Sequence, residues 1–330
     1  MTAPAAATNP VKAFLRLVMI EHSVFALPFA YLATLTAMRL HTACGLDRYG
    51  WGDDGWFVYT GSYDGSVNFG LVEGSCGVGD WFDLTTFLLI TAAMVAARTF
   101  AMAANRLIDR EVDARNPRTA QRELVTGAVT LRTARVGAAV ALVVFLAVAA
   151  TLGPLPLLLA PLAVVPLVVY PYAKRFTDYP HAVLALAQAV APIGAWIAVT
   201  GEWSWSAVVL GVGVGLWIGG FDLVYACQDT ESDREQGVRS FPARWGNAAA
   251  LTTARLVHVV VFGLFVWFGA LEGFGAVWYA GLALAAVAFV YQHAIVRPDD
   301  LSRVDRSFFT SNGVVGLALG AAGVLDLLLR

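Results

Sequence analysis

The chain alternates between long apolar blocks and shorter polar segments. Each block is roughly 20 residues long, and most charged residues lie in the segments between blocks. A helix needs about 20 apolar residues to cross about 30 Å of hydrocarbon, whereas the strands of a membrane barrel give segments of about 10 residues with alternating polarity. The pattern therefore predicts an all-α polytopic membrane protein with nine transmembrane helices. We expect these helices at residues 14–39, 83–104, 131–151, 154–173, 179–200, 205–226, 247–270, 274–296 and 307–328.

The fourth block differs from the others in its proline content. It carries Pro154, Pro156, Pro161, Pro166 and Pro171. A proline inside a helix removes one backbone hydrogen bond and clashes with the preceding turn. We therefore expect this helix to be kinked or broken, with neighbouring helices satisfying the freed carbonyl groups.

The composition agrees with a membrane protein. Of 330 residues, 58% are hydrophobic and only 14% are charged, and the mean hydropathy is +0.66. These values exclude a soluble domain, and a net charge of −2 does not indicate a nucleic-acid partner. We predict one transmembrane domain over residues 1–330, surrounded by lipid. Its first block is longer than the apolar region of a signal peptide, which predicts an uncleaved span.

The distribution of basic residues predicts the orientation. If the nine helices alternate across the bilayer, all 22 Lys and Arg residues except Arg39, Arg48, Arg98 and Arg330 fall on the side of the N-terminus. By the positive-inside rule, that side is the cytoplasm, which predicts a multi-pass protein of the plasma membrane. The long charged segments 105–130 and 227–246 lie on this side, whereas most external links are tight turns. We therefore expect the chemistry, and the N-terminus, on the cytoplasmic side.

The external segment 41–82 is an exception because it is long and rich in aspartate and aromatic residues. Its aromatic runs flank a Gly-Ser-Tyr-Asp-Gly turn, so it forms either a small hairpin on the membrane surface or an inserted loop without function. Cys44 and Cys76 both fall on the oxidising side, which predicts a disulfide between them. Cys227, on the reducing side, is interpreted as a packing residue.

Polar groups recur every four residues after the second block, at Asn105, Asp109 and Asp113. At 100° per residue, these positions share one face of a helix. A second row begins inside the sixth block and runs past its end, at Asp222, Asp229 and Asp233 with Tyr225 beside it. At 100° per residue these three carboxylates lie within about 20° of one helical line. Asp222 lies inside the apolar block, where a central carboxylate costs about 2.5–3.5 kcal/mol, so it needs a partner or a purpose.

Two carboxylate rows at one end of a helical bundle are typical of a site for a hard divalent cation. Mg²⁺ prefers carboxylate and water oxygens and commonly bridges to phosphates. The alternative is that these carboxylates merely balance nearby arginines. Basic residues interleaved with the rows would complete a cradle for a diphosphate group. They are Arg110, Arg115, Arg118, Lys174, Arg175, Arg234 and Arg239.

Other polar residues interrupt the apolar blocks. Arg98 lies seven residues before Asn105, on nearly the same face but about two turns deeper, where it suits a bidentate bond to a carboxylate of the protein or of a ligand. Glu21 and His22 near the inner end of the first block indicate either a structural pair with an arginine or a role in binding the acceptor. We interpret His258 and His293 as structural, because their spacing is not that of metal ligands.

The two rows resemble the paired signatures of the UbiA superfamily of intramembrane prenyltransferases, Asn-x3-Asp-x3-Asp and Asp-x2-Tyr-x3-Asp-x3-Asp. The resemblance extends to the segment Tyr-Pro-Tyr-Ala-Lys-Arg at 170–175 and to the position of Arg98, and it covers nearly the whole chain. It implies nine helices around a central cavity that the motif loops cover on the cytoplasmic side. It also implies that both rows bind Mg²⁺ and a polyprenyl diphosphate, with Lys174 and Arg175 contacting the diphosphate.

Residues 21–30 and 113–119 are similar to the 4-hydroxybenzoate polyprenyltransferase-like branch, which includes enzymes of the futalosine route to menaquinone. The resemblance implies Mg²⁺-dependent transfer of a polyprenyl group to an aromatic acid of the 4-hydroxybenzoate or dihydroxynaphthoate type in quinone biosynthesis. The long 41–82 segment departs from the short link usual in the family but does not touch the motifs. The catalytic residues expected on this basis are Asp109, Asp113, Asp229, Asp233 and Tyr225. The expected substrate-binding residues are Arg98, Asn105, Lys174, Arg175, Asp222, Arg115 and Arg118, and the expected metal ligands are Asn105, Asp109, Asp113, Asp222, Asp229 and Asp233.

Three alternatives stay open at this point. One is another prenyltransferase of the same superfamily. A CDP-alcohol phosphotransferase would also be helical and rich in carboxylates, but its Asp-Gly-x2-Ala-Arg core is absent. A transporter would carry its charges near the middle of the membrane, whereas these cluster at the helix ends.

Overall fold

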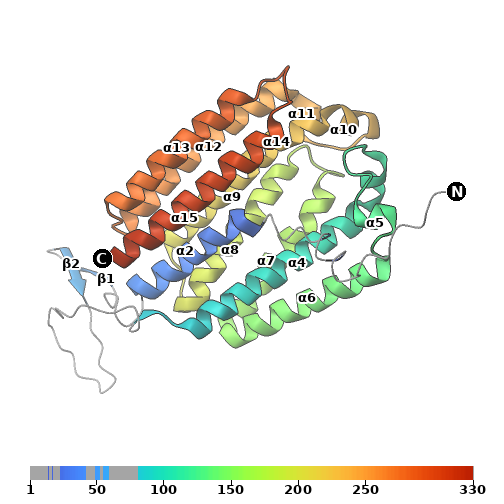
Figure 1. Cartoon of the computed structure of the whole chain (residues 1–330). Coiled ribbons are helices and arrows are strands. Elements are labelled where there is room, and N and C mark those ends of the chain that lie inside the picture. The colour runs from blue at the N-terminus through green and yellow to red at the C-terminus, as the bar shows by residue number, and fades with distance from the viewer. Residues whose placement is uncertain are drawn as a thin grey trace.

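The computed structural model describes residues 14, 17, 23–41, 49–52, 55–58 and 81–329. Long helices run side by side through this part of the chain (Figure 1). Eight of the described helices are long and apolar enough to cross a membrane. Together with α2, which covers part of the first predicted span, they confirm the all-α membrane class. The long helices are α2 (Ser23–His41), α4 (Leu84–Arg115), α6 (Leu131–Leu152), α7 (Pro154–Ala173), α8 (Pro180–Thr200), α9 (Trp205–Ala226), α12 (Asn247–Leu271), α13 (Ala276–Ile295) and α15 (Asn312–Leu329).

The two ends of the bundle differ. Figure 1 shows short helices gathered at one end, and the strands β1 (Tyr49–Gly52) and β2 (Gly55–Val58) at the opposite end. We call the end with the short helices the motif end, because both carboxylate rows lie there. Its short helices are α5 (Glu123–Thr126), the 3-10 turn η2 (Cys227–Asp229), α10 (Thr230–Gln236), α11 (Phe241–Trp245) and α14 (Val304–Arg306).

The strands form an antiparallel hairpin in which Trp51 faces Trp56. A hairpin was one of two alternatives for the external segment, but its turn follows Gly52 rather than the Gly-Ser-Tyr-Asp-Gly sequence. That sequence, and both Cys44 and Cys76, lie outside the described residues. Cys227 is buried and free, in agreement with a packing role.

Two predicted helices differ from the structure. The second was expected to end at residue 104, but α4 continues to Arg115 because the row from Asn105 to Asp113 is itself helical. The fourth was expected to be kinked or broken. It is not broken: α7 is one helix with Pro161, Pro166 and Pro171 inside it.

Helix α9 is the centre of the described bundle. In its apolar stretch 78% of the residues are buried, whereas none of the other seven helices counted above as membrane spans exceeds 44%. Gly211, Gly215 and Gly219 of α9 allow a close approach to α8. A Cβ atom added at Gly211 would lie 2.5 Å from the carbonyl oxygen of Ala189, and one at Gly219 would lie 3.0 Å from that of His181. Such small-residue faces let two helix backbones approach closely.

Candidate functional site

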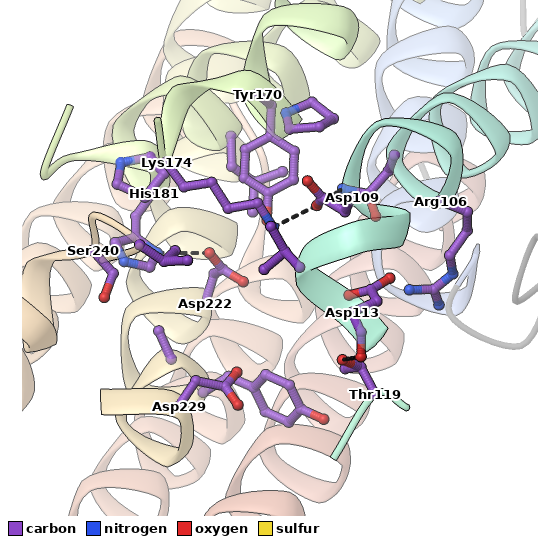
Figure 2. Close-up of a pocket in the computed structure, with 18 of the residues that line it drawn as sticks. Arg106, Asp109, Asp113, Thr119, Tyr170, Lys174, His181, Asp222, Asp229 and Ser240 are labelled. Atoms are coloured by element: carbon purple, nitrogen blue, oxygen red, sulfur yellow. Dashed lines mark hydrogen bonds and ion pairs between the residues drawn. The ribbon is translucent and has the colours of Figure 1, made fainter. Parts of the chain in front are cut away.

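A cavity of about 400 Å³ opens at the motif end, between α4, α7, α8 and α9. Its volume lies within the range of ligand pockets. Figure 2 shows Asp109 and Asp113 on one side of it and Asp222 and Asp229 on the other. The structure thus brings both predicted rows to a single cavity. The predicted site residues that line it are Arg98, Asn105, Asp109, Asp113, Arg118, Lys174, Asp222, Tyr225, Asp229, Asp233 and Arg239.

Asp109 lies in the wall formed by α4 and is 2% exposed. The ammonium group of Lys174, at the end of α7, forms an ion pair with its Oδ2 atom (Figure 2). Asn105 Nδ2 donates a weaker hydrogen bond to the same oxygen, at 3.4 Å. The other oxygen, Oδ1, is buried and accepts no hydrogen bond from the described residues, although Arg175 Nη1 lies 3.6 Å away.

Asp113 lies one turn further along α4 and is also buried. Arg122 Nη1 donates to its Oδ1 atom at 2.6 Å. Thr119 Oγ1 donates to the main-chain oxygen of Asp113 at 3.0 Å, which folds the loop after α4 back onto the helix (Figure 2). This loop carries Arg118 and Arg122 back to the rim of the cavity.

Asp229 is held from the opposite side of the cavity. Arg118 donates to both carboxylate oxygens of Asp229, and Asn116 Nδ2 donates to Oδ1 at 3.0 Å. The guanidinium group of Arg118 also lies 5.2 Å from the centre of the Tyr225 ring. Burial alone would lower the pKa of Arg118, but the hydrogen bonds and charge of Asp229 outweigh burial and raise it. Arg118 therefore stays charged and ties the loop after α4 to the second row.

Asp233 completes the second row at α10, where Ser240 Oγ donates to its Oδ2 atom at 2.7 Å. The second row was expected to follow one helical line. It does not, because α9 ends at Ala226 and the 3-10 turn η2, which contains Asp229, lies between α9 with Asp222 and α10 with Asp233. A 3-10 turn has three residues per turn instead of 3.6, so it changes the direction in which the later side chains point.

Asp222, the deepest carboxylate of the second row, has a partner that the sequence did not indicate. Its Oδ2 atom lies 2.7 Å from Nδ1 of His181, at the start of α8 (Figure 2). The contact with His181 offsets the cost of a carboxylate inside an apolar helix.

Several predicted cations lie elsewhere. Arg175 does not line the cavity: it donates to the carbonyl oxygens of Ile108 at 2.8 Å and Pro171 at 3.0 Å, joining α7 to α4. Arg115 is exposed and also lies outside the cavity lining. Glu21 and His22 lie outside the described residues.

The histidines interpreted as structural pair with each other, since His258 Nδ1 lies 2.8 Å from His293 Nε2. Sequence reasoning missed several polar residues that line the cavity. The signals were weak: Arg106 and Arg122 flank the first row without its spacing, and His181 is a lone polar residue at a helix start. The missed residues are Arg106, Asn116, Thr119, Arg122, Tyr170, His181, Gln188 and Ser240.

The donor set fits a hard divalent cation. Asp109 and Asp113 face Asp229 and Asp233 across the cavity, and a buried oxygen of Asp109 lacks a hydrogen-bond donor among the described residues. Within those residues, no three acidic, histidine or cysteine side chains converge on one point. Mg²⁺ is usually bound by one or two carboxylates and completes its shell with water and substrate phosphates.

Residues 71–313, most of the chain, match the family described as UbiA prenyltransferase family. The chain belongs to this family. The resemblance of the two motifs to the UbiA superfamily is thereby confirmed.

Curated relatives of this UbiA protein are named for aromatic prenyl transfer. It is 32% identical over 244 residues to a 4-hydroxybenzoate octaprenyltransferase of Aromatoleum aromaticum. This alignment covers 74% of this chain and 82% of the relative. It is 32% identical over 240 residues to a 4-hydroxybenzoate solanesyltransferase of Synechocystis sp., which covers 72% of this chain and 80% of the relative. This UbiA protein is a prenyltransferase.

Solved structures share the fold. An apo UbiA homolog from Aeropyrum pernix superposes with a TM-score of 0.73 at 31% identity, covering 93% of this chain and 98% of the other. A UbiA homolog from Archaeoglobus fulgidus, bound to GPP and Mg²⁺, superposes with a TM-score of 0.62 at 17% identity, covering 96% and 99% of the two chains.

Proposed function

We propose that this UbiA protein transfers a polyprenyl group from a polyprenyl diphosphate to an aromatic carboxylic acid of the 4-hydroxybenzoate or dihydroxynaphthoate type, with Mg²⁺, in quinone biosynthesis. One observation carries the proposal: two carboxylate rows face each other across one cavity, with Lys174, Arg118 and Arg122 paired to them. The relatives named for transfer to 4-hydroxybenzoate support this choice of acceptor.

We assign Mg²⁺ ions to the two rows, with one or two carboxylates for each ion: Asp109 and Asp113 with the amide oxygen of Asn105 in the first row, and Asp229 and Asp233 in the second. Bound there, Mg²⁺ would neutralise part of the negative charge on the departing diphosphate. The earlier expectation that Asp222 also binds metal is not kept, because its Oδ2 atom is already held by His181.

The cations Lys174, Arg118 and Arg122 provide the charge-assisted donors for the diphosphate oxygens. Each of these side chains lines the cavity and contacts a carboxylate there. A phosphate group bound beside those carboxylates could therefore accept hydrogen bonds from these cations without rearrangement of the helices. The other expected substrate cations, Arg115 and Arg175, are assigned no contact with the diphosphate, since they lie outside the cavity lining.

The reaction forms one carbon–carbon bond. The bond between the allylic C1 and the diphosphate oxygen breaks with both electrons leaving on the diphosphate, and a ring carbon of the acceptor donates an electron pair to C1. The ring then loses the proton from that carbon to a base in the cavity, either an aspartate of one of the rows or the released diphosphate. Apolar side chains deeper in the cavity exclude the water that would otherwise capture the allylic cation. They include Leu167, Leu184, Ile218 and Phe221.

We assign the carboxylate of the acceptor to Arg98. Arg98 lines the cavity on α4, about 10 Å from Asn105 along the helix axis, and an arginine fork supplies two parallel hydrogen bonds to a carboxylate. Tyr225 and Phe308 form an aromatic wall with ring centres 4.5 Å apart, against which a prenyl chain or an aromatic ring can pack. By the positive-inside rule, we place the motif end at the cytoplasmic face of the plasma membrane.

Membranes that contain the protein provide the test. They are incubated with geranyl diphosphate, Mg²⁺ and either 4-hydroxybenzoate or 1,4-dihydroxy-6-naphthoate, and products are identified by mass spectrometry. We expect a prenylated acid and equimolar diphosphate, both lost when Mg²⁺ is chelated. Release of diphosphate without a prenylated acid, or no reaction with either acceptor class, would contradict the proposal.

A further inference from the structure

One face of α8 contributes polar groups to a wall that is otherwise apolar. His181 and Gln188 both line the cavity, with Leu184 between them. Positions seven residues apart lie on the same face of a helix, so the two polar side chains follow one line from the motif end into the membrane. In the proposed function, His181 contacts neither the metal, the diphosphate nor the acceptor.

The position of the His181 ring is determined by Asp222. With Nδ1 at 2.7 Å from Asp222 Oδ2, the ring places its proton between these two atoms. A neutral imidazole with a proton on Nδ1 has a lone pair on Nε2, which can accept a hydrogen bond. Nε2 is buried and has no hydrogen-bond partner among the described residues. A buried polar atom without a partner is costly, so it calls for a ligand group.

Backbone packing keeps this pair in place. The His181 carbonyl oxygen lies 3.0 Å from where a Cβ atom of residue 219 would be, which is tighter than an ordinary contact, so Gly219 of α9 lets the two helices come this close. Asp222 follows one turn after Gly219 on the same helix. The contact between α8 and α9 therefore sets the separation of the imidazole and the carboxylate.

Resting on the function proposed above, we propose that His181 Nε2 accepts the hydrogen bond of the ring hydroxyl of the aromatic acceptor, and that Asp222 is the positioning residue for His181. A hydroxyl that donates a hydrogen bond releases more electron density into its ring. The ring carbon next to that hydroxyl is then the better nucleophile toward C1 of the prenyl group.

The placement of the charged groups agrees with this orientation. A para-hydroxybenzoate carries its carboxylate and its hydroxyl at opposite ends of the ring. Arg98 lies about 16 Å from Asp109 along α4, whereas Asp222 lies about 12 Å from Asp229 along α9 and η2. An acceptor with its carboxylate on Arg98 and its hydroxyl on His181 therefore points the hydroxyl end, and the reactive carbon beside it, toward the carboxylate rows.

The test compares two acids that differ only in the hydroxyl. Binding of 4-hydroxybenzoate and of benzoate to the purified protein is measured by calorimetry, alongside kcat and KM for 4-hydroxybenzoate and geranyl diphosphate. His181→Asn keeps an amide N–H near the Nδ1 position but has nothing at the Nε2 position, whereas His181→Gln places an amide near Nε2. His41→Asn is the matched control, because it breaks a similar histidine–carboxylate pair, with Glu272 at 3.0 Å, away from the cavity lining.

We expect the wild-type protein to bind 4-hydroxybenzoate about 10- to 100-fold more tightly than benzoate. In His181→Asn that ratio falls to near one while benzoate affinity and the KM for geranyl diphosphate stay unchanged. His181→Gln recovers part of the ratio, and His41→Asn keeps all of it.

A wild-type ratio in His181→Asn would overturn the proposal, and so would equal weakening of both acids or of geranyl diphosphate. If His181→Asn does not fold, Asp222→Ala gives the second test, because alanine removes the partner of Nδ1 and the freed ring must lower the same ratio. An unchanged ratio in that variant overturns the proposal equally. Failure of the proposed function would give a different result from failure of the His181 proposal, because the wild-type protein itself would then bind neither acid and form no product.

Discussion

The glycines of α9 lead to a prediction about stability that the structure makes quantitative. A Cβ atom at residue 215 would overlap the carbonyl oxygen of Ala185 and lie 3.0 Å from the Cβ atom of Ala189. Gly215→Ala therefore forces α8 and α9 to separate by about 1 Å before ordinary contact is restored. Overpacking of this kind costs about 1–3 kcal/mol of unfolding free energy.

Gly194→Ala is the matched control, because it introduces the same methyl group on α8 where no other atom lies within 4 Å. Alanine favours a helix over glycine by up to about 1 kcal/mol, so this variant is expected to be as stable as the wild type or more stable. The two variants should thus differ by about 1–4 kcal/mol.

Thermal unfolding of both purified variants in one detergent measures this difference, and the kcat/KM for the aromatic acid measures its effect on the site. Gly215→Ala should unfold at a lower temperature and bind the acid more weakly, because the contact between α8 and α9 also holds His181 against Asp222. Equal unfolding temperatures for Gly215→Ala and Gly194→Ala would refute the close approach of these helices.

Three further predictions concern the site and the external segment. Asp109→Asn and Asp229→Asn should each abolish prenyl transfer in folded protein, because only the charge of the metal ligand is lost. The exposed control Asp300→Asn should stay active. Near-normal activity of either site variant across Mg²⁺ concentrations would contradict a metal role. Arg98→Lys should lower the kcat/KM for the aromatic acid by the equivalent of about 2–5 kcal/mol with little change in the KM for prenyl diphosphate, and equal weakening of both substrates would indicate a structural arginine. Cys44 and Cys76 should react with a maleimide only after reduction, and prenyl transfer should survive their replacement; labelling of both thiols without reduction would exclude the disulfide.

The helices were predictable because hydropathy reports on each span separately. The expected spans 131–151, 154–173 and 205–226 agree within a residue with α6, α7 and α9. The first row was predictable for a similar reason: positions four residues apart on one helix share a face whatever surrounds them. In both cases the information lies within a single helix.

The partners across the cavity were not predictable in this way. Asp222 was grouped with Asp229 by periodicity, yet η2 interrupts the line and Asp222 pairs with His181, 41 residues earlier in the chain. Arg175 was assigned to a diphosphate because it is one of the basic residues interleaved with the rows and belongs to the segment 170–175 that resembles the family. Its guanidinium group instead donates to backbone carbonyls of two helices. Charge and spacing do not distinguish a ligand contact from a helix-to-helix contact, because an arginine suits both.

The carboxylates and cations of the cavity are already neutralised in pairs. Lys174, Arg122 and Arg118 pair with Asp109, Asp113 and Asp229 respectively. A divalent ion that bound the carboxylates alone would leave these cations without ion-pair partners, and a diphosphate that bound the cations alone would leave the carboxylates without theirs. When both bind, the carboxylates contact the ion and the cations contact the diphosphate. The ion and the prenyl diphosphate should therefore bind with positive cooperativity, each raising the affinity for the other by the same factor.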